Sequence, residues 1–188
     1  EMKQRVGALV GPVAEKMWVS TFHSACVRIL RREADIIGFP SNFTIYDQAD
    51  AVRLTGYVIR DLGLDPKRYQ PRAVHSIISS AKNDGFDAAA FQARADGGAG
   101  MGMEKRAADI YVEYQKRLLQ ASAMDFDDLL LNAVKLFRQA PETLAYYQRR
   151  FKHILVDEYQ DTNGVQNELV VKLASAHGNV TVVGDSDQ

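Results

Sequence analysis

The 188-residue sequence predicts an α/β fold in which a parallel sheet carries a large, all-helical insertion. Short apolar runs predict strands at residues 16–20, 153–157 and 180–184. A helix-length segment, residues 165–176, separates the second run from the third. Strands without polar alternation that are joined through a helix are typical of a parallel sheet covered on both faces. The C-terminal third of the sequence therefore predicts a βαβ unit.

Most of the chain between the first two predicted strands has helical spacing of its apolar residues. Gly38 ends the first of these helices, Asp47 is a candidate N-cap with Gly63 beyond the same helix, and Pro71 precedes another. The predicted helices span 23–37, 48–62, 72–82, 105–120 and 127–138. This pattern predicts a core formed by residues 1–38 and 124–188, interrupted by a helical subdomain at residues 39–123.

Composition limits the class of protein. With 46% hydrophobic residues the chain can bury a core, and 23 Lys and Arg against 24 Asp and Glu create no global positive field, so any nucleic-acid site has to be local. The single cysteine, Cys26, excludes a disulfide framework and fits a reducing, cytoplasmic setting. We expect no membrane span and no signal peptide. The abrupt end at VVGDSDQ suggests a piece of a longer protein.

A glycine-rich stretch at residues 96–105, DGGAGMGMEK, contains a G-x-G-x-G pattern. A phosphate-binding loop requires a preceding buried strand and a lysine followed by Ser or Thr, and Met103 follows the glycines here. We therefore predict a flexible loop between helices.

Polar residues follow each predicted strand, where ligands bind in open parallel sheets. Ser20, Thr21 and His23 follow the first, Asp157 and Glu158 the second, and Asp185 and Gln188 the third. Adjacent acids on an extended chain point to opposite sides, so one can hold Mg²⁺ while the other orients or deprotonates a water. The alternative is a solvated strand end whose acids cap the next helix.

Several stretches together resemble the superfamily I DNA helicases of the UvrD/Rep/PcrA type. ILVDEYQDTN (154–163) and VVGDSDQ (182–188) resemble motif II and the opening of motif III, and further matches lie in EMKQRV (1–6), WVSTFHSACVRILRR (18–32) and MDFDDLL (124–130). The resemblance implies part of a P-loop-type (RecA-like) motor core that lacks the P-loop strand. It also implies ATP-driven 3′-to-5′ movement on single-stranded DNA, with a role in repair.

Carried over to this sequence, the resemblance implies that Asp157 coordinates magnesium and that Glu158 is the base for the water attacking the γ-phosphate. Gln188 would sense that phosphate, and Asp185 would lie near the metal and phosphates. Mg²⁺ and ATP are the implied cofactors, and both need parts of the family absent from residues 1–188, so this chain alone is expected to be inactive.

The resemblance also implies contacts to single-stranded DNA by Thr21, His23 and Phe126, with single-strand/duplex junctions and repair proteins as partners. His23 could instead be a helix cap, and Phe126 could pack in the core with Leu129 and Leu130 at helical spacing.

Three other functions stay open at this point. One is a non-enzymatic DNA- or protein-binding module, and another is the helicase part of a helicase–nuclease. The third is a metal-dependent phosphohydrolase built on Asp125, Asp127, Asp128, Asp157, Glu158 and Asp185.

Overall fold

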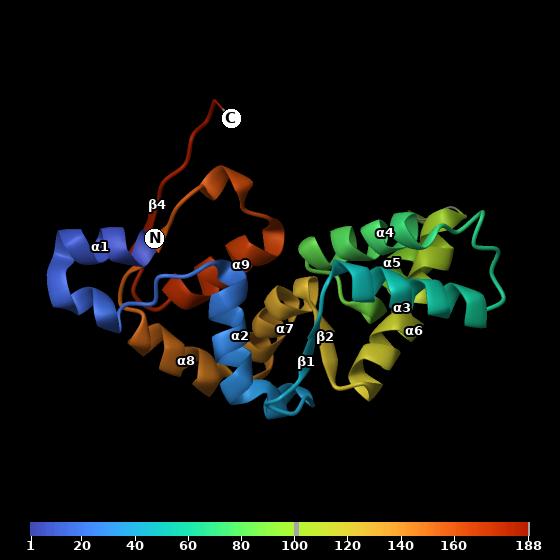
Figure 1. Ribbon diagram of the computed structural model, residues 1–188, viewed down its shortest axis with the longest axis horizontal. Helices are drawn as coiled ribbons and strands as arrows, with labels where there is room; N and C mark the ends of the chain where they lie inside the picture. Colours follow the sequence, from blue (N-terminus) through green and yellow to red (C-terminus); the bar gives the residue numbers. More distant parts are fainter. Residues whose placement is uncertain (100–101, 188) are drawn as a thin grey trace.

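The computed structural model describes residues 1–99 and 102–187, which form two lobes joined by a pair of short strands (Figure 1). The first lobe contains α1 (Met2–Val10), α2 (Phe22–Glu33), α7 (Phe126–Gln139), α8 (Pro141–Arg150), β3 (Ile154–Val156), α9 (Gly164–Ala174) and β4 (Val180–Val182). The second lobe contains α3 (Gln48–Asp61), α4 (Pro71–Asn83), α5 (Ala88–Arg94) and α6 (Met103–Gln120). The described chain is thus mostly helical, with small parallel sheets.

Short 3₁₀ and π segments complete the described chain: η1 (Gly11–Lys16), η2 (Ala34–Ile37), η3 (Ala95–Ala99, a π-helical turn) and η4 (Tyr159–Asp161). The π turn occupies residues 96–99 of the predicted glycine-rich loop, α6 begins at Met103, and residues 100–101 of that loop lie outside the described residues. No helix in the described ranges is long and apolar enough to cross a membrane.

The predicted βαβ unit is confirmed at the C-terminal end. β3 pairs in parallel with β4, Leu155 opposite Thr181, and α9 connects them. Burial on both faces was a wrong prediction, because Leu155 is 72% exposed and all three residues of β4 are exposed. Within the described residues, Ile154 of β3 packs against the core and Val156 is buried, whereas all three residues of β4 are exposed.

The strand predicted at residues 16–20 is wrong. Lys16 ends a 3₁₀ helix, and the next residues are irregular with no strand paired to them in the described part of the chain. The apolar character of this run has another cause: the Trp18 ring packs edge-on against Phe151, 4.8 Å between centroids, under the Arg28 guanidinium. The run is therefore irregular backbone that places the Trp18 ring against the core.

A second parallel pair, which the sequence did not predict, joins the lobes. β1 (Thr44–Tyr46) pairs with β2 (Ala123–Asp125), with Ile45 opposite Met124. Figure 1 shows these two strands running side by side at the centre of the molecule. The chain enters and leaves the second lobe through this pair.

Each lobe has its own hydrophobic core. In the first, Phe43 and Met124 pack with residues of α2, α7 and α9. In the second, α3, α4, α5 and α6 form a core whose buried members lie between Ala51 and Ala123 in the sequence. Phe39 and Phe43 belong to the first core, although both fall within the predicted insertion, which starts at residue 39. The division into 1–38, 39–123 and 124–188 stays a prediction.

Helix ends follow the expected signals. The Asp47 side chain accepts a hydrogen bond from Asp50 N at 2.9 Å and caps α3, as predicted. Gly38 and Gly63 adopt positive φ beyond helix ends, where a residue with a Cβ would be strained. Helices α1, α5 and α8 were not predicted.

Candidate functional site

The two adjacent acids lie in an exposed loop directly after β3, which we call the acid loop (residues 157–163). Glu158 adopts a left-handed conformation, with φ 52° and ψ 44°, and its backbone N–H donates to Asp157 Oδ1 at 3.0 Å. Few non-glycine residues adopt this conformation, and such strain often marks functional positions. The turn leaves both carboxylates exposed to solvent.

The end of β4 lies against the acid loop. The Tyr159 N–H donates to Val183 O at 2.9 Å, and the Val183 N–H donates to Val156 O at 2.8 Å. The Gln160 side chain then joins the two strand ends, because its Nε2 donates to Glu158 Oε2 at 2.6 Å and its Oε1 accepts from Asp185 N at 3.1 Å.

Parallel pairing thus brings together Asp157, Glu158 and Asp185, as the sequence predicted, while Gln188 lies outside the described residues. The sequence alone does not identify these two partners of Gln160. A Cβ on Gly184 would lie 2.8 Å from Gln160 Oε1, so the glycine permits this close approach.

The alternative explanation for the two acids was that they cap the next helix, α9. A different residue makes that cap. Asn163 caps α9: its side chain accepts from Gln166 N at 2.9 Å, and the Gln166 side chain accepts from Asn163 N at 3.0 Å. Neither Asp157 nor Glu158 takes part in this capping box. Their carboxylates are therefore available for a ligand.

The left-handed turn at Glu158 gives a stability prediction. Glu158→Gly should be more stable than Glu158→Ala by about 1 kcal/mol, because glycine tolerates positive φ. Both variants lose the contact to Gln160 equally. The order should reverse at Asp161, in the following 3₁₀ turn, where Asp161→Gly should be less stable than Asp161→Ala. Urea unfolding of the four variants measures both differences, and a more stable Glu158→Ala would contradict the strained conformation.

The residues predicted to contact DNA meet at the starts of α2 and α7. Thr21 is the N-cap of α2, where its Oγ1 accepts from Ser24 N at 3.2 Å. The His23 ring lies edge-on to the Phe126 ring, with centroids 6.3 Å apart. Thr21 thus has the capping role, and His23, the other candidate for that role, contacts the aromatic.

Phe126 is 47% exposed, whereas Leu129 and Leu130 on the same helix are 1% exposed. The alternative in which Phe126 shares their core packing is therefore wrong. The first turn of α2 contains no acidic residue, whereas that of α7 contains Asp127 and Asp128. A helix N-terminus attracts anions unless carboxylates already lie there, so a phosphate fits the start of α2 better than the start of α7.

A buried ion-pair cluster, which the sequence analysis missed, lies at the N-terminal end of α7, the helix that begins at Phe126. Lys82 Nζ of α4 is 2.7 Å from Asp125 Oδ2 and 2.8 Å from Asp128 Oδ1, and none of the three side chains is more than 3% exposed. The Tyr114 hydroxyl donates to Asp125 Oδ2 at 2.7 Å, and Gln115 Nε2 donates to Asp128. The available signal was the position of Lys82 on the apolar face of its helix, four residues after Ile78.

The cluster perturbs its own titration. Burial lowers the pKa of Lys82, but the Asp125 and Asp128 carboxylates more than offset this effect and leave that pKa raised. Burial and the Asp125 charge raise the pKa of Asp128 to about 6. Burial also opposes ionisation of Asp125, but Lys82 outweighs it and lowers the Asp125 pKa. Asp125 is the charged partner of Lys82, and Asp128 is the carboxylate that protonates first.

The six acids of the phosphohydrolase alternative do not form one site. Within the described residues, the group with metal-binding geometry is His75, Asp125 and Asp127, whose ligand atoms lie within 4.8 Å of one another. Lys82 already supplies a cation to Asp125 there. The exposed carboxylates of the acid loop do not belong to this group.

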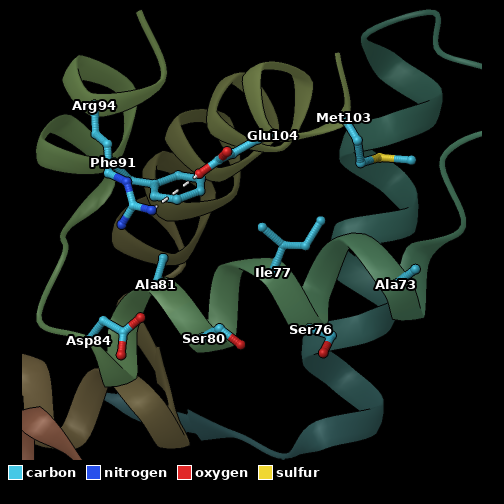
Figure 2. A pocket seen from close by; sticks show the side chains of 10 residues that line it. All are labelled: Ala73, Ser76, Ile77, Ser80, Ala81, Asp84, Phe91, Arg94, Met103 and Glu104. Carbon is cyan, nitrogen blue, oxygen red and sulfur yellow. Dashed lines mark ion pairs between the residues drawn. The ribbon is translucent and has the colours of Figure 1, made fainter. Parts of the chain in front are cut away.

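A cavity of about 710 Å³ lies away from both sets of residues, between α4, α5 and the start of α6 (Figure 2). Ile77, Ala81 and Phe91 give it an apolar wall. Arg94 is the one cation among its described lining residues, and Figure 2 shows it joined to Glu104, 3.8 Å away. This cavity offers no unpaired cation for a phosphate.

The whole chain, residues 1–188, matches the model of the family described as UvrD/REP helicase N-terminal domain. It is 47% identical over 188 residues to the ATP-dependent DNA helicase PcrA of Bacillus subtilis and, equally, to PcrA of Staphylococcus aureus strain Mu50. It is 48% identical over 200 residues to the ATP-dependent DNA helicase UvrD1 of Mycobacterium tuberculosis H37Rv. These matches cover all of the chain but 25% of each relative, so the chain spans about a quarter of their length.

Proposed function

The chain belongs to the UvrD/REP helicase N-terminal domain family, and we propose that it supplies catalytic carboxylates and a DNA-contacting surface to an ATP-dependent DNA helicase. The observation that carries the proposal is the link from Glu158 through Gln160 to Asp185. It holds the acids at the ends of two parallel strands, where α/β proteins bind ligands. The longer relatives, of which this chain spans about a quarter, are named as ATP-dependent DNA helicases.

The acid loop fits a hard divalent cation. No Lys or Arg of the described ranges forms an ion pair with Asp157, Glu158 or Asp185, so these carboxylates keep their charge for another cation. Oxygen donors of this kind suit Mg²⁺, which binds through one or two carboxylates together with phosphate oxygens. We assign Asp157 to hold the ion, which when bound would neutralise charge on the phosphates of ATP.

In this proposal Glu158 is the base. Its Oε2 accepts from Gln160, which fixes the carboxylate while its other oxygen stays available to take a proton from the attacking water. Gln160 is a positioning residue, and Asp185 lies at the same edge through its backbone contact to Gln160. Gln188 would sense the γ-phosphate. The sequence contains no G-x-x-x-x-G-K-[ST] cradle, so residues 1–188 alone are expected not to hydrolyse ATP.

On the DNA side, we propose that Thr21 and His23 contact a phosphate at the start of α2 while a base stacks on Phe126. A hydroxyl, an imidazole and exposed N–H groups at a helix N-terminus suit phosphate oxygens, and a half-exposed ring suits a base of any sequence. The proposal also includes movement from 3′ to 5′ and binding at single-strand/duplex junctions. It further includes a cytoplasmic role in repair with repair-protein partners, and residues 39–123 as a subdomain. A helicase–nuclease would use the same surface.

The DNA half is tested on the chain itself. Phe126→Ala should weaken binding of an oligothymidylate by roughly 5- to 150-fold, since stacking of one base contributes about 1–3 kcal/mol. Fluorescence anisotropy at constant salt measures the affinity. Phe126→Tyr should keep it because the ring is retained. Tyr57→Ala is the matched control, since Tyr57 of α3 is also 47% exposed and should not matter. Equal losses from Phe126→Ala and Tyr57→Ala would refute a stacking site at Phe126.

A further inference from the structure

The last turn of α4 contacts both halves of the proposed machinery through two consecutive residues, Lys82 and Asn83. Both residues close α4 in the second lobe, and each of them reaches a different helix of the first lobe.

Lys82 holds the start of α7. Its ammonium bridges Asp125 and Asp128, which form the capping box of that helix: Asp128 N donates to Asp125 Oδ1 at 2.8 Å, and Asp125 N donates to Asp128 Oδ2 at 3.2 Å. Phe126 lies inside this box, between the two acids. The backbone that presents the exposed ring is therefore fixed by a buried cation from α4.

Asn83 holds the start of α9. The Asn163 Nδ2 donates to Asn83 Oδ1 at 3.0 Å, while Asn163 Oδ1 caps the helix through Gln166 N. A Cβ on Gly164 would lie 3.5 Å from Asn83 O, so the two segments approach closely. Asn163 is the last residue of the acid loop, so this contact reaches the chain that carries Asp157 and Glu158.

We propose that Lys82 and Asn83 are positioning residues that tie the DNA-contacting start of α7 to the acid loop, an inference that rests on the proposed function. Helices α7 and α9 also contact each other directly, but the ion pair between them, Arg138 to Glu168 at 2.6 Å, joins the last turn of α7 to the middle of α9. At the opposite ends, where Phe126 and the acid loop lie, side chains of α4 make the connection. Ordering the start of α7 by DNA therefore also stabilises the cap of α9.

Hydrogen exchange of the 188-residue chain with and without an oligothymidylate tests this tie. In the parent chain, DNA should slow amide exchange in the first turn of α7 and also at residues 159–167, by about two- to tenfold at the second place, the effect of one hydrogen bond. Asn83→Ala should abolish the change at 159–167 and keep the change in α7. DNA affinity should stay within about twofold, as for a substitution away from the bound strand.

Matched variants separate the tie from general loosening. Asn83→Asp keeps the oxygen that Asn163 uses and should restore the effect, whereas Asn163→Asp keeps a capping oxygen but has no donor and should behave like Asn83→Ala. Arg138→Gln, which breaks the other link, should leave the effect intact.

Bound DNA that leaves residues 159–167 of the parent chain unchanged would overturn the positioning role and spare the proposed function. An effect that survives Asn83→Ala would do the same. A chain that binds no DNA at all would refute the proposed DNA surface, and the tie with it.

Discussion

Glu158→Gln should lower DNA-stimulated ATP turnover by about two orders of magnitude or more, in line with typical general-base contributions, while ATP still binds. The measurement uses the complete polypeptide that carries residues 1–188. Glutamine keeps the size of the side chain and can still meet Gln160, but it cannot accept a proton from water. The loss therefore falls on the chemical step, and nucleotide affinity, measured separately by titration, should stay close to the parent value.

Asp157→Asn is the matched variant on the neighbouring carboxylate. Because it removes charge that would face a metal both before and during reaction, magnesium–nucleotide affinity and turnover should fall together. The split between the two variants separates a base from a metal ligand. A Glu158→Gln enzyme with normal turnover would remove the assignment of this site as a helicase active site, and a loss of magnesium–nucleotide affinity in Glu158→Gln but not in Asp157→Asn would reverse the two roles.

Much of the acid site was predictable because its geometry depends on local signals. The apolar run before Asp157 and the run before Asp185 predict two parallel strands, and parallel strands place the residues at their carboxyl ends along one edge. The role of Gln160 was not predictable in detail, because its link depends on the left-handed turn at Glu158 and on the close approach of Gly184. Neither feature has a periodic signal.

The wrong predictions share one cause: an apolar run need be neither a strand nor buried. Trp18 lies in such a run, but no strand of the described chain pairs with it. Its ring instead packs against Phe151 from a stretch of irregular backbone. Conversely, β1 and β2 have three residues each, and their pairing joins segments almost eighty positions apart in the register of Ile45 with Met124. Short strands with distant partners leave little periodicity to detect.

The DNA surface was predictable in its residues but not in its arrangement. Resemblance implied Thr21, His23 and Phe126, and only the packing of α2 on α7 places the His23 ring on Phe126. Lys82 was missed altogether, because a lysine late in an amphipathic helix is ordinarily at the solvent-exposed end. Its burial depends on two acids more than forty residues further along the chain.

Lys82→Met should destabilise the chain by about 3–5 kcal/mol near neutral pH, the range for breaking a buried ion pair by removing one partner. Methionine fills most of the volume, so the cost comes from the carboxylates of Asp125 and Asp128, which stay buried and lose their cation. Tyr114 and Gln115 still donate to them but carry no charge. Denaturant unfolding measures the free-energy difference.

The dependence of that loss on pH identifies its origin. Without Lys82, burial raises the folded-state pKa of both carboxylates above their unfolded values, so they favour folding at low pH, and this contribution is lost as the pH rises through the folded pKa. In the parent chain the lowered pKa of Asp125 favours folding at high pH instead. Of the two carboxylates only Asp128, with a pKa of about 6, favours folding at low pH. The difference in unfolding free energy between Lys82→Met and the parent should therefore become markedly smaller as the pH falls from about 8 to about 5.

Ile78→Ala, one turn earlier on α4 and fully buried, is the matched control. It should cost about 2–5 kcal/mol by leaving a cavity, an amount similar to the ion-pair loss, but with no recovery on acidification because no charge is involved. If Lys82→Met shows the same flat pH dependence as Ile78→Ala, the lysine acts by filling space and Asp125 and Asp128 do not depend on its charge. Recovery confined to Lys82→Met would establish that a single buried cation holds the start of α7 against α4.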